Sequence, residues 1–422
     1  MTTDDPPLRT RAPVAPVRIA ITGLGVCTPI GVGVGPFWEA ALAGVNGMRE
    51  IRGFAHADLR THVGGEIDDF EPREFMSAEH AALAGRGEQL AVAAVRMAVE
   101  QAGLAGEGIA HFAPERRAVS FGSFGESARL DDVVAATLAS GWGALPHELV
   151  QRLPSRIAYA VAAAFDCRGS IFNLPALCAA GNYAIGYGAD VLRCGRADVV
   201  LAGGSDAFSR IAFVGFNRLR ATAPDRVRPF DLNRAGMILA EGSGALVLER
   251  LEDAQARGAL VLAELLDYGL GCDAHNVAIP HPEGRGGVIA LRQALARAGV
   301  AAEELDYISA HGTGTRENDR VETRILKEVL GAHAARVKIS SLKSMVGHTI
   351  SAASAIEAVA CVQSLRTGWL TPTINYETPD PDCDLDYVPN VAQAHPTELI
   401  ASNAYAFGGN CATLLLRRFV GA

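Results

Sequence analysis

The sequence predicts an α/β protein in which strands and helices alternate through two similar halves. Apolar, β-rich runs recur along the 422 residues, and most are followed by a helical pattern of 10–20 residues, as in layered α/β folds. The runs are apolar almost throughout, so we expect strands that are buried on both faces. The apolar share of 49% is large enough for an extensive core, and 20% charged residues is too few for a disordered chain.

The first half is expected to become ordered at Val17, after a Pro-rich tail at 1–16 that we expect to be disordered. From Val17 an apolar run closed by glycines and Thr-Pro predicts a buried strand followed by a loop. A Ser cap and a final Gly bound an Ala-rich pattern that predicts one long helix over 77–103. The other predicted helices of this half lie at 36–44, 129–139, 155–165 and 179–195, and its later strands at 116–125, 170–176, 197–206 and 237–250.

The second half repeats the alternation. Its predicted helices lie at 286–299, 319–330 and 351–367, and its predicted strands at 306–312, 337–344 and 412–418. No long linker separates the halves, so we expect them to pack as one body. The boundary is placed near 255–260, which gives an N-terminal domain at 17–258 and a C-terminal domain at 259–422.

Composition excludes several classes of protein. A net charge of −9 argues against a nucleic-acid binder, and no apolar run reaches the roughly 18–20 residues that a membrane helix needs. The first 16 residues contain no apolar h-region, so we expect no secretory signal. The eight cysteines are scattered, with no C-x-x-C and no zinc-site spacing. We therefore expect reduced thiols, a soluble cytoplasmic protein and no metal site.

Cys178 is the first candidate for chemistry. It follows an apolar strand and opens a helix rich in Ala and Gly, AAGNYAIGYG. At a helix N-terminus the macrodipole and the unpaired N–H groups are expected to stabilise a thiolate, the nucleophilic form of cysteine. A buried, inert thiol is the alternative, and it is the commonest fate of a free cysteine.

Two histidines occupy comparable positions. His311 follows a strand in HGTGT, and His348 follows another in KSMVGH. Either one alone would more often be a structural, hydrogen-bonded residue. Together with Cys178 they lie at the carboxyl ends of apolar strands, where α/β sheets gather active sites. A thiolate beside two imidazoles suits thioester chemistry, because sulfur holds the acyl group and imidazole N–H groups stabilise an enolate or oxyanion.

The segment SNAYAFGGNC at 402–411 adds a possible backbone element. Gly408 and Gly409 follow an aromatic residue and predict a tight turn that could aim N–H groups at an oxyanion. A plain glycine turn is the alternative.

These segments, in this order, resemble the β-ketoacyl-acyl-carrier-protein synthases of the elongating type, which serve dissociated fatty-acid and type II polyketide systems. The resemblance covers 17–419, through ITGLGVCTPIG, CAAGNYAIG, VVLAGGSDAF, RPFD, EGSGALVLE, HGTGT, KSMVGH and the FGG turn. It implies a thiolase-like five-layer αβαβα fold, usually a homodimer. It also implies an acyltransferase that performs a ping-pong, decarboxylative Claisen condensation.

The resemblance also implies roles for individual residues. Cys178 would take an acyl chain from the phosphopantetheine arm of an acyl carrier protein. His311 and His348 would assist decarboxylation of a malonyl thioester and stabilise the enolate that attacks the acyl-cysteine. Lys343 is similar to a structural lysine of the family, and Glu357 to the glutamate that pairs with it.

Further residues would bind substrate. The N–H groups of Cys178 and Phe407 would form the oxyanion hole, with Phe407 as a gate at the Gly408–Gly409 turn. Thr313 and Thr315 are similar to family residues that contact the arm. Phe230 is similar to one that contacts the malonyl group, and Phe124 to one that contacts the acyl chain. No bound cofactor is implied beyond the carrier's own 4'-phosphopantetheine.

The sequence departs from the family pattern at three places. Leu177 replaces the usual Ala before the nucleophile, which suggests a narrower wall. Cys411 replaces an Asn that normally braces the FGG turn, so the rigidity of the gate is in question. Phe124 lies where an Ile often lines the acyl tunnel at the dimer interface, and we expect it to shorten or redirect that tunnel.

These departures favour a polyketide or polyene assembly line over fatty-acid elongation, which is the alternative. A non-catalytic chain-length-factor-like subunit is a rival, but such subunits typically replace the nucleophile. Thiolases use a second Cys in place of His348, and initiating synthases pair the Cys with His and Asn. A cysteine hydrolase is disfavoured because the sequence supplies no acidic or amide residue at the usual spacing to orient the His. A heterodimer with a chain-length partner is compatible with the sequence. Carrier proteins are acidic, and Arg218 and Arg220 are candidates to contact one.

Overall fold

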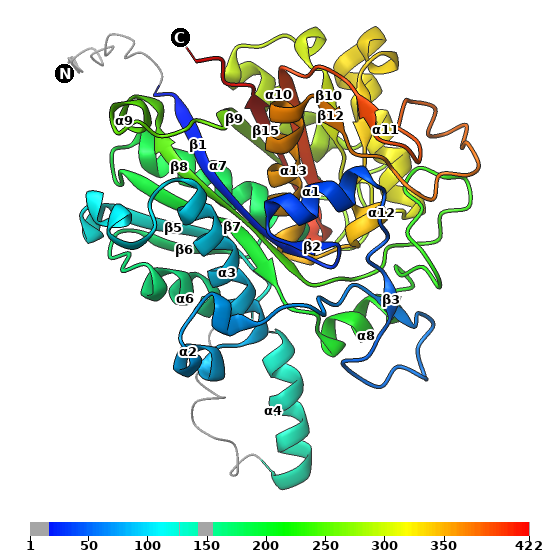
Figure 1. Ribbon diagram of the computed structural model, residues 1–422. Helices are drawn as coiled ribbons and strands as arrows, with labels where there is room; N and C mark the ends of the chain where they lie inside the picture. Colours follow the sequence, from blue (N-terminus) through cyan, green and yellow to red (C-terminus); the bar gives the residue numbers. More distant parts are fainter. Residues whose placement is uncertain (1–16, 126, 142–154, 422) are drawn as a thin grey trace, which may run out of the picture.

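A computed structural model describes residues 17–125, 127–141 and 155–421, so the expected N-terminal tail lies outside the described residues. Within the described part of the chain, no helix is both long enough and apolar enough to cross a membrane. The ribbon is shown in Figure 1, where the helix α4 (Ser127–Ser140) projects from the body of the molecule.

Two five-stranded units with the same topology form the sheet. The strands of the first unit are β1 (Ile19–Thr28), β5 (Arg117–Gly122), β6 (Ile171–Leu174), β7 (Val199–Asp206) and β8 (Gly242–Arg250). Those of the second are β9 (Ala263–Cys272), β10 (Tyr307–Ser309), β11 (Lys338–Ser340), β14 (Leu399–Tyr405) and β15 (Asn410–Arg417). Their orders, β6-β5-β7-β8-β1 and β11-β10-β14-β15-β9, are both 3-2-4-5-1 when each unit is numbered along the chain.

Strand directions repeat as well. In each unit the first three strands of that order are parallel and the last two are antiparallel to their neighbours. The units join where β1 pairs antiparallel with β9, with Ile19 opposite Leu265. Because parallel strands end at the same edge of a sheet, the repeat brings equivalent βα turns of the two halves to the centre of the molecule.

Helices complete five layers in the order αβαβα. The first unit is covered outside by α3 (Arg86–Gln101) and α6 (Arg156–Ala164), and the second by α10 (Arg285–Ala298) and α11 (Arg316–Leu330). Between the units lie α7 (Ala180–Arg193) and α13 (Ala353–Thr367), which contact strands of both halves (Figure 1). The expected thiolase-like layering is therefore confirmed.

The central helices pack closely because their contact is made by small residues. All residues of α13 from Ala353 to Leu365 are buried. A Cβ at Gly181 of α7 would lie 2.5 Å from the backbone nitrogen of Ala355, so only glycine permits this approach. The N–H of Asn182 also donates to Ser354 Oγ at 3.0 Å. This contact holds the starts of α7 and α13 in a fixed relation.

The remaining elements are short or lie outside these layers. They are β2 (Gly31–Val32), α1 (Val34–Leu42), β3 (Arg49–Glu50), β4 (Val63–Gly64), α2 (Ala78–Leu83), α8 (Arg210–Arg218), α9 (Leu251–Ala256), α12 (Lys343–Val346), β12 (Trp369–Leu370) and β13 (Gln393–Ala394). The expected boundary between the halves falls between α9 and β9.

Two expected elements differ in the structure. The single helix expected over 77–103 is two helices, because Ala84 adopts an extended conformation with ψ of 143°. Gln89 Nε2 donates to the carbonyl oxygens of Ala81 and Ala84 at 2.9 and 3.3 Å, which satisfies groups freed by the break. The strand expected over 337–344 ends at Ser340, and Lys343 begins the short helix α12 instead.

Candidate active site

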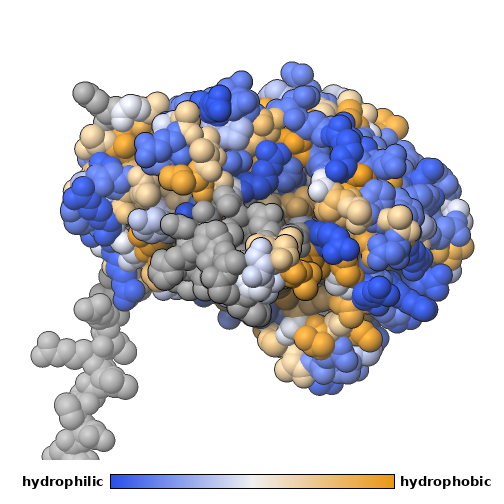
Figure 2. Space-filling model, turned by 90° about the horizontal axis from the view of Figure 1, so that it is seen from below, coloured by the Kyte–Doolittle hydropathy of each residue, from blue (hydrophilic) through white to orange (hydrophobic). Residues whose placement is uncertain are grey.

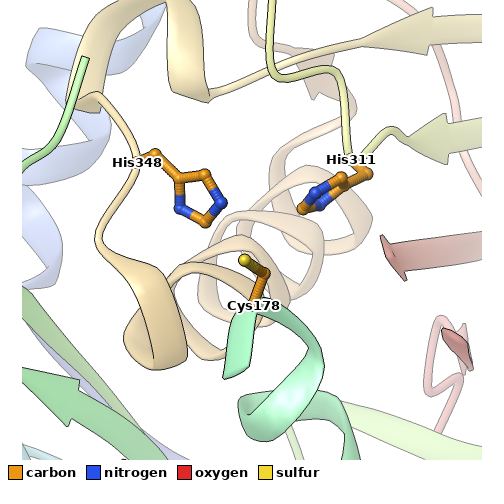
Figure 3. Close-up of side chains that lie close together, drawn as sticks. All are labelled: Cys178, His311 and His348. Atoms are coloured by element: carbon orange, nitrogen blue, oxygen red, sulfur yellow. The ribbon is translucent and has the colours of Figure 1, made fainter. Parts of the chain in front are cut away.

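Three turns at the centre of the molecule bring Cys178, His311 and His348 together. Their Sγ and imidazole nitrogen atoms lie within 4.8 Å of one another, and all three side chains are buried. In Figure 3 both rings face the sulfur, which lies at the start of a helix. Cys178 precedes α7, His311 follows β10 and His348 precedes α13, so each comes from a βα turn of the repeated unit.

A strained turn presents Cys178. Leu177 has a φ of 49°, which costs a non-glycine residue roughly 1–2 kcal/mol relative to ordinary backbone. The turn runs through a 3-10 segment, Leu177–Ala179, directly into α7. The thiol is thus fixed at the tip of a sharp strand-to-helix connection, where packing of α7 against strands of both units maintains the strain.

The environment of Cys178 raises its pKa to about 11, chiefly because the thiol is buried. The Lys343 charge and the backbone N–H groups of Phe407 and Cys178 act in the opposite direction. The expectation that the helix N-terminus keeps a thiolate is therefore wrong for the free protein, because desolvation outweighs these groups. The N–H groups of Phe407 and Cys178 nevertheless both face the sulfur, and the oxyanion hole expected from them stays a prediction.

Backbone contacts clamp His348. Its N–H donates to Ile238 O at 2.7 Å, and its carbonyl accepts from Ala240 N at 3.0 Å. Its Nδ1 accepts from Ile350 N–H at 3.1 Å, which places the proton of the neutral ring on Nε2. That Nε2 is buried and has no hydrogen-bond partner among the described residues. Burial and then Lys343 hold the His348 pKa well below its usual range, so the ring is neutral.

His311 is held by buried acids and by Lys343. Its N–H and that of Gly312 donate to the two Glu322 carboxylate oxygens at 2.9 and 2.8 Å. Lys343 Nζ lies 3.4 Å from His311 Nδ1 and can only donate, so the proton of a neutral ring lies on Nε2. Burial, Lys343 and His348 lower the His311 pKa well below its usual range. The Nε2–H groups of His311 and His348 are therefore two hydrogen-bond donors in the cavity that also contains Cys178.

Lys343 and Glu357 form a buried ion pair beneath the histidines, with Nζ and Oε1 2.5 Å apart. Burial raises the Glu357 pKa to about 7, although Lys343 lowers it. Removing one partner of such a pair would leave an uncompensated group in the core. The geometry fits the supporting role expected for both residues.

The HGTGT loop is braced by α11. The N–H of Gly314 donates to both carboxylate oxygens of Asp319 at 3.2 Å. Gly312 and Gly314 have φ of 36° and 75°, conformations that favour glycine. Thr313 and Thr315 lie with their hydroxyl oxygens 2.9 Å apart, and both line the main cavity. The same cavity is lined by Cys178, so the two hydroxyls and the thiol share one space.

The main cavity has a volume of about 540 Å³ and ends at Cys178, His311 and His348. Its mouth carries the exposed side chains of Arg60, Arg220 and Arg316, and no ion pair joins these three to a carboxylate of the described residues. Arg220 is one of the two arginines expected near a carrier, whereas Arg218 is exposed and does not line this cavity.

Phe407 separates this cavity from a smaller one, and it lines both. Its ring packs on Phe216 with centroids 5.5 Å apart. The turn beside it is tied from outside, because Gly408 N–H donates to Val277 O at 2.7 Å and Gly409 O accepts from Asp273 N at 2.9 Å. These two bonds brace the turn in which Cys411 replaces the family asparagine.

Some expected contact residues are placed differently. Phe230 is fully buried and stacks on Tyr387, with ring centroids 3.9 Å apart, and it does not line the main cavity. The Gly408 N–H is committed to Val277 and does not converge on Cys178, whereas Gly409 does line the main cavity. Phe124 and Leu177 line the smaller cavity.

Sequence reasoning missed three buried carboxylates that shape the centre. Glu322 and Asp319 position the His311 loop. Asp206, at the end of β7, accepts from the N–H groups of Ser351 and Phe124 at 2.7 and 2.9 Å. Burial raises the Asp206 pKa to about 7 and the Glu322 pKa to about 8. The sequence did contain a signal for two of them, because Asp319 and Glu322 lie on the apolar side of the helix that follows HGTGT.

Cys178, His311 and His348 are also a donor set that zinc accepts. The Lys343 ammonium beside His311 opposes a second cation, however, and the two neutral imidazoles already have the tautomers needed to donate. Two donors and a thiol around one cavity suit acyl transfer and enolate stabilisation.

The raised thiol pKa predicts how Cys178 reacts with pH. Since the thiolate fraction grows as pH approaches about 11, alkylation by iodoacetamide is expected to rise roughly tenfold per pH unit from pH 7 to 10. Peptide mapping measures the rate, and the peptide of the exposed Cys194 reports reagent activity in the same digest. A plateau by pH 8 would show that the thiol is already ionised.

Comparison with known families gives two adjacent matches. The model described as "Beta-ketoacyl synthase, N-terminal domain" matches residues 17–254. The model described as "Beta-ketoacyl synthase, C-terminal domain" matches residues 262–377.

Individual relatives match over nearly the whole chain. The tetracenomycin polyketide synthase ketoacyl synthase alpha subunit of Streptomyces glaucescens is 39% identical, covering 95% of this chain and 97% of the relative. The 3-oxoacyl-[acyl-carrier-protein] synthase 2 of Synechocystis sp. is 36% identical, covering 95% and 98%.

Solved structures agree in fold. The ishigamide ketosynthase/chain length factor gives a TM-score of 0.92 at 40% identity, over 96% of this chain and 100% of that one. A type II PKS acyl-carrier protein in complex with its ketosynthase bound to the hexaketide gives 0.87 at 32% identity, over 96% and 100%.

Proposed function

The chain belongs to the beta-ketoacyl synthase family and is a condensing acyltransferase, and from this premise we propose how its own residues perform the reaction. Cys178 carries the acyl chain, and His311 and His348 stabilise the enolate that extends it. The observation that carries this assignment is the meeting of one thiol and two neutral imidazoles at the end of a single cavity.

The first half-reaction loads Cys178. Its sulfur attacks the carbonyl carbon of an acyl thioester on the phosphopantetheine arm of an acyl carrier protein. The carbon–sulfur bond to the arm breaks, and the thiol proton goes to the departing arm. The N–H groups of Cys178 and Phe407 hold the oxyanion, and the same two groups with Lys343 favour the thiolate. Thr313 and Thr315 contact the arm.

The second half-reaction makes the carbon–carbon bond. A malonyl thioester enters the same cavity and loses carbon dioxide, and the electron pair left behind forms an enolate. The Nε2–H groups of His311 and His348 donate to its oxygen, since the Nδ1 of each ring faces another donor. The enolate carbon attacks the acyl carbonyl, and the bond to Cys178 breaks. The 3-oxoacyl thioester leaves on the carrier, and the released Cys178 thiolate takes up a proton from water to restore the thiol.

Reconstitution tests this proposal. Purified protein, an acyl-carrier thioester and malonyl-carrier are expected to give 3-oxoacyl-carrier, observed by mass spectrometry together with an acyl adduct on the protein. An adduct that passes to water without any product would instead indicate a hydrolase. A protein that forms neither, alone or with a co-expressed partner subunit, would contradict catalysis.

An acyl carrier protein is the proposed macromolecular partner, and the arginines at the mouth support it. Carriers are acidic, and the mouth carries three arginines without a carboxylate partner among the described residues. Reversing Arg60 and Arg220 to Glu is expected to raise the KM for carrier-bound substrate roughly tenfold while leaving small pantetheine thioesters unaffected. Arg196→Glu, on an exposed side chain before β7, is the matched control. An unchanged KM would remove these arginines from the interface.

A second chain is proposed to pair at the β6 edge, as a homodimer or with a chain-length partner. β6 ends the sheet, and Ile171 there and Tyr159 nearby are 41% and 60% exposed. Figure 2 shows the face from which α4 projects, where apolar and polar residues are intermixed. Sedimentation with and without Ile171→Asp tests the pairing.

The eight unpaired cysteines support a cytoplasmic location.

A further inference from the structure

A second cavity begins at Cys178 on the far side of Phe407. It has a volume of about 200 Å³, and Cys178 and Phe407 line both it and the main cavity. An acyl group on Cys178 can therefore extend into this smaller cavity while the carrier arm occupies the main one. Within the part of the chain that the structure describes, the other residues that line it are all apolar or glycine: Phe124, Leu177, Ile211, Ala212, Gly215, Phe216, Leu219 and Ile350.

One wall of this cavity is a stripe along α8. Residues 211, 212, 215, 216 and 219 recur at helical spacing, and none brings a hydroxyl, amide or charge. The helix presents its side to the cavity, so its N–H and C=O groups point along the axis. On the opposite wall, the N–H groups of Phe124 and Ile350 already donate to Asp206 and His348.

The residues that line this cavity are most buried beside Cys178, and we call this end its inner part. Ile350 is 5% exposed and Cys178 is 4% exposed, whereas Phe124, Ile211 and Leu219 form an exposed outer end. Carbon 3 of a bound acyl chain is only three bonds from the sulfur, so it must lie in the inner part.

The main cavity is different in character. Thr313, Thr315, Asn276 and the arginines at its mouth offer hydrogen bonds along its length. A polar arm is accommodated there, and a ketone at carbon 3 of a thioester still attached to the arm would find donors. The same ketone on a chain that extends from Cys178 into the smaller cavity would meet only apolar side chains of the described residues, and an unpaired buried carbonyl disfavours binding roughly tenfold to a hundredfold.

We propose that Cys178 accepts chains that are hydrocarbon at carbon 3, either saturated or unsaturated, and discriminates against chains that carry a ketone there. This inference rests on the proposed function of Cys178. It places a reduction between successive condensations: a separate reductase, using a hydride donor, must convert the 3-oxo product before the chain returns to the thiol.

The test compares two acyl groups of equal length. Hexanoyl-carrier and 3-oxohexanoyl-carrier are offered separately to the full chain, with its partner subunit if one is required, and the rate of the Cys178 adduct is followed by intact mass. Hexanoyl is expected to load at least roughly tenfold faster. Equal rates, or faster loading of the 3-oxo chain, would overturn the inference while leaving the proposed function intact. No adduct with either chain would overturn both.

A matched pair of variants shows whether cavity polarity causes the preference. Ala212→Thr and Ala212→Val add almost the same volume to the half-buried stripe of α8, but only Thr brings a hydroxyl. The hexanoyl-to-3-oxohexanoyl ratio is expected to be at least about threefold smaller in the Thr variant, because the hydroxyl can donate to the ketone. Equal ratios in the two variants would show that polarity of this wall does not set the preference, and the inference would fail.

Discussion

Cys178→Ala is expected to abolish acyl loading and lower condensation by at least about 10³-fold. The thiol is the group within the cluster that can form a thioester, and the imidazoles beside it are neutral donors whose pKa values lie well below the usual range. Intact mass after exposure to acyl-carrier measures loading, and product formation with malonyl-carrier measures condensation.

The control for this experiment is Cys167→Ala. Cys167 is also a buried, unpaired thiol, but it lies in the core beneath Phe165, away from the active-site cavity. This control variant distinguishes the effect of losing the nucleophile from the effect of losing any buried sulfur. An acyl adduct that persists in Cys178→Ala and disappears in Cys167→Ala would assign the chemistry to the wrong residue.

The sequence predicted most of the scaffold because its signals were local. Long apolar runs such as 17–31 and 197–206, and helices such as 179–195 and 351–367, correspond to β1, β7, α7 and α13. The βα turns at Cys178, His311 and His348 carry short motifs that could be recognised without the fold. The family comparison and the layering bear out the class of protein that these motifs indicated.

What the sequence did not predict depends on the environment of each residue in three dimensions. The helix start at Cys178 suggested a thiolate, but the surrounding layers bury the sulfur and raise its pKa to about 11. The position of Phe230 in RPFD suggested a cavity residue, yet Tyr387, distant along the chain, covers its ring. The break at Ala84 also escaped detection, because Gln89 supports it through side-chain bonds and no Pro marks the place.

His348→Ala is expected to separate the two half-reactions. Loading of Cys178 depends on the thiol and on the N–H groups of Cys178 and Phe407, which this substitution leaves in place. Condensation requires donors for the enolate, and loss of one such donor typically costs about 10²–10³-fold. We therefore expect an acyl-enzyme that still forms, and that reacts with malonyl-carrier roughly 10²–10³-fold more slowly.

The structure explains why this residue should act through its ring. The backbone of His348 is clamped by Ile238 and Ala240, and Ala retains both of those bonds. The substitution removes the Nε2–H, whose nitrogen is buried without a partner among the described residues, and also the Nδ1 that accepts from Ile350 N–H. His80→Ala, on an exposed helix face, controls for loss of a histidine. Carbon dioxide release from malonyl-carrier is the decisive measurement. If release continues at the wild-type rate in His348→Ala, other groups stabilise the enolate, and the Nε2–H of His348 has no part in the reaction.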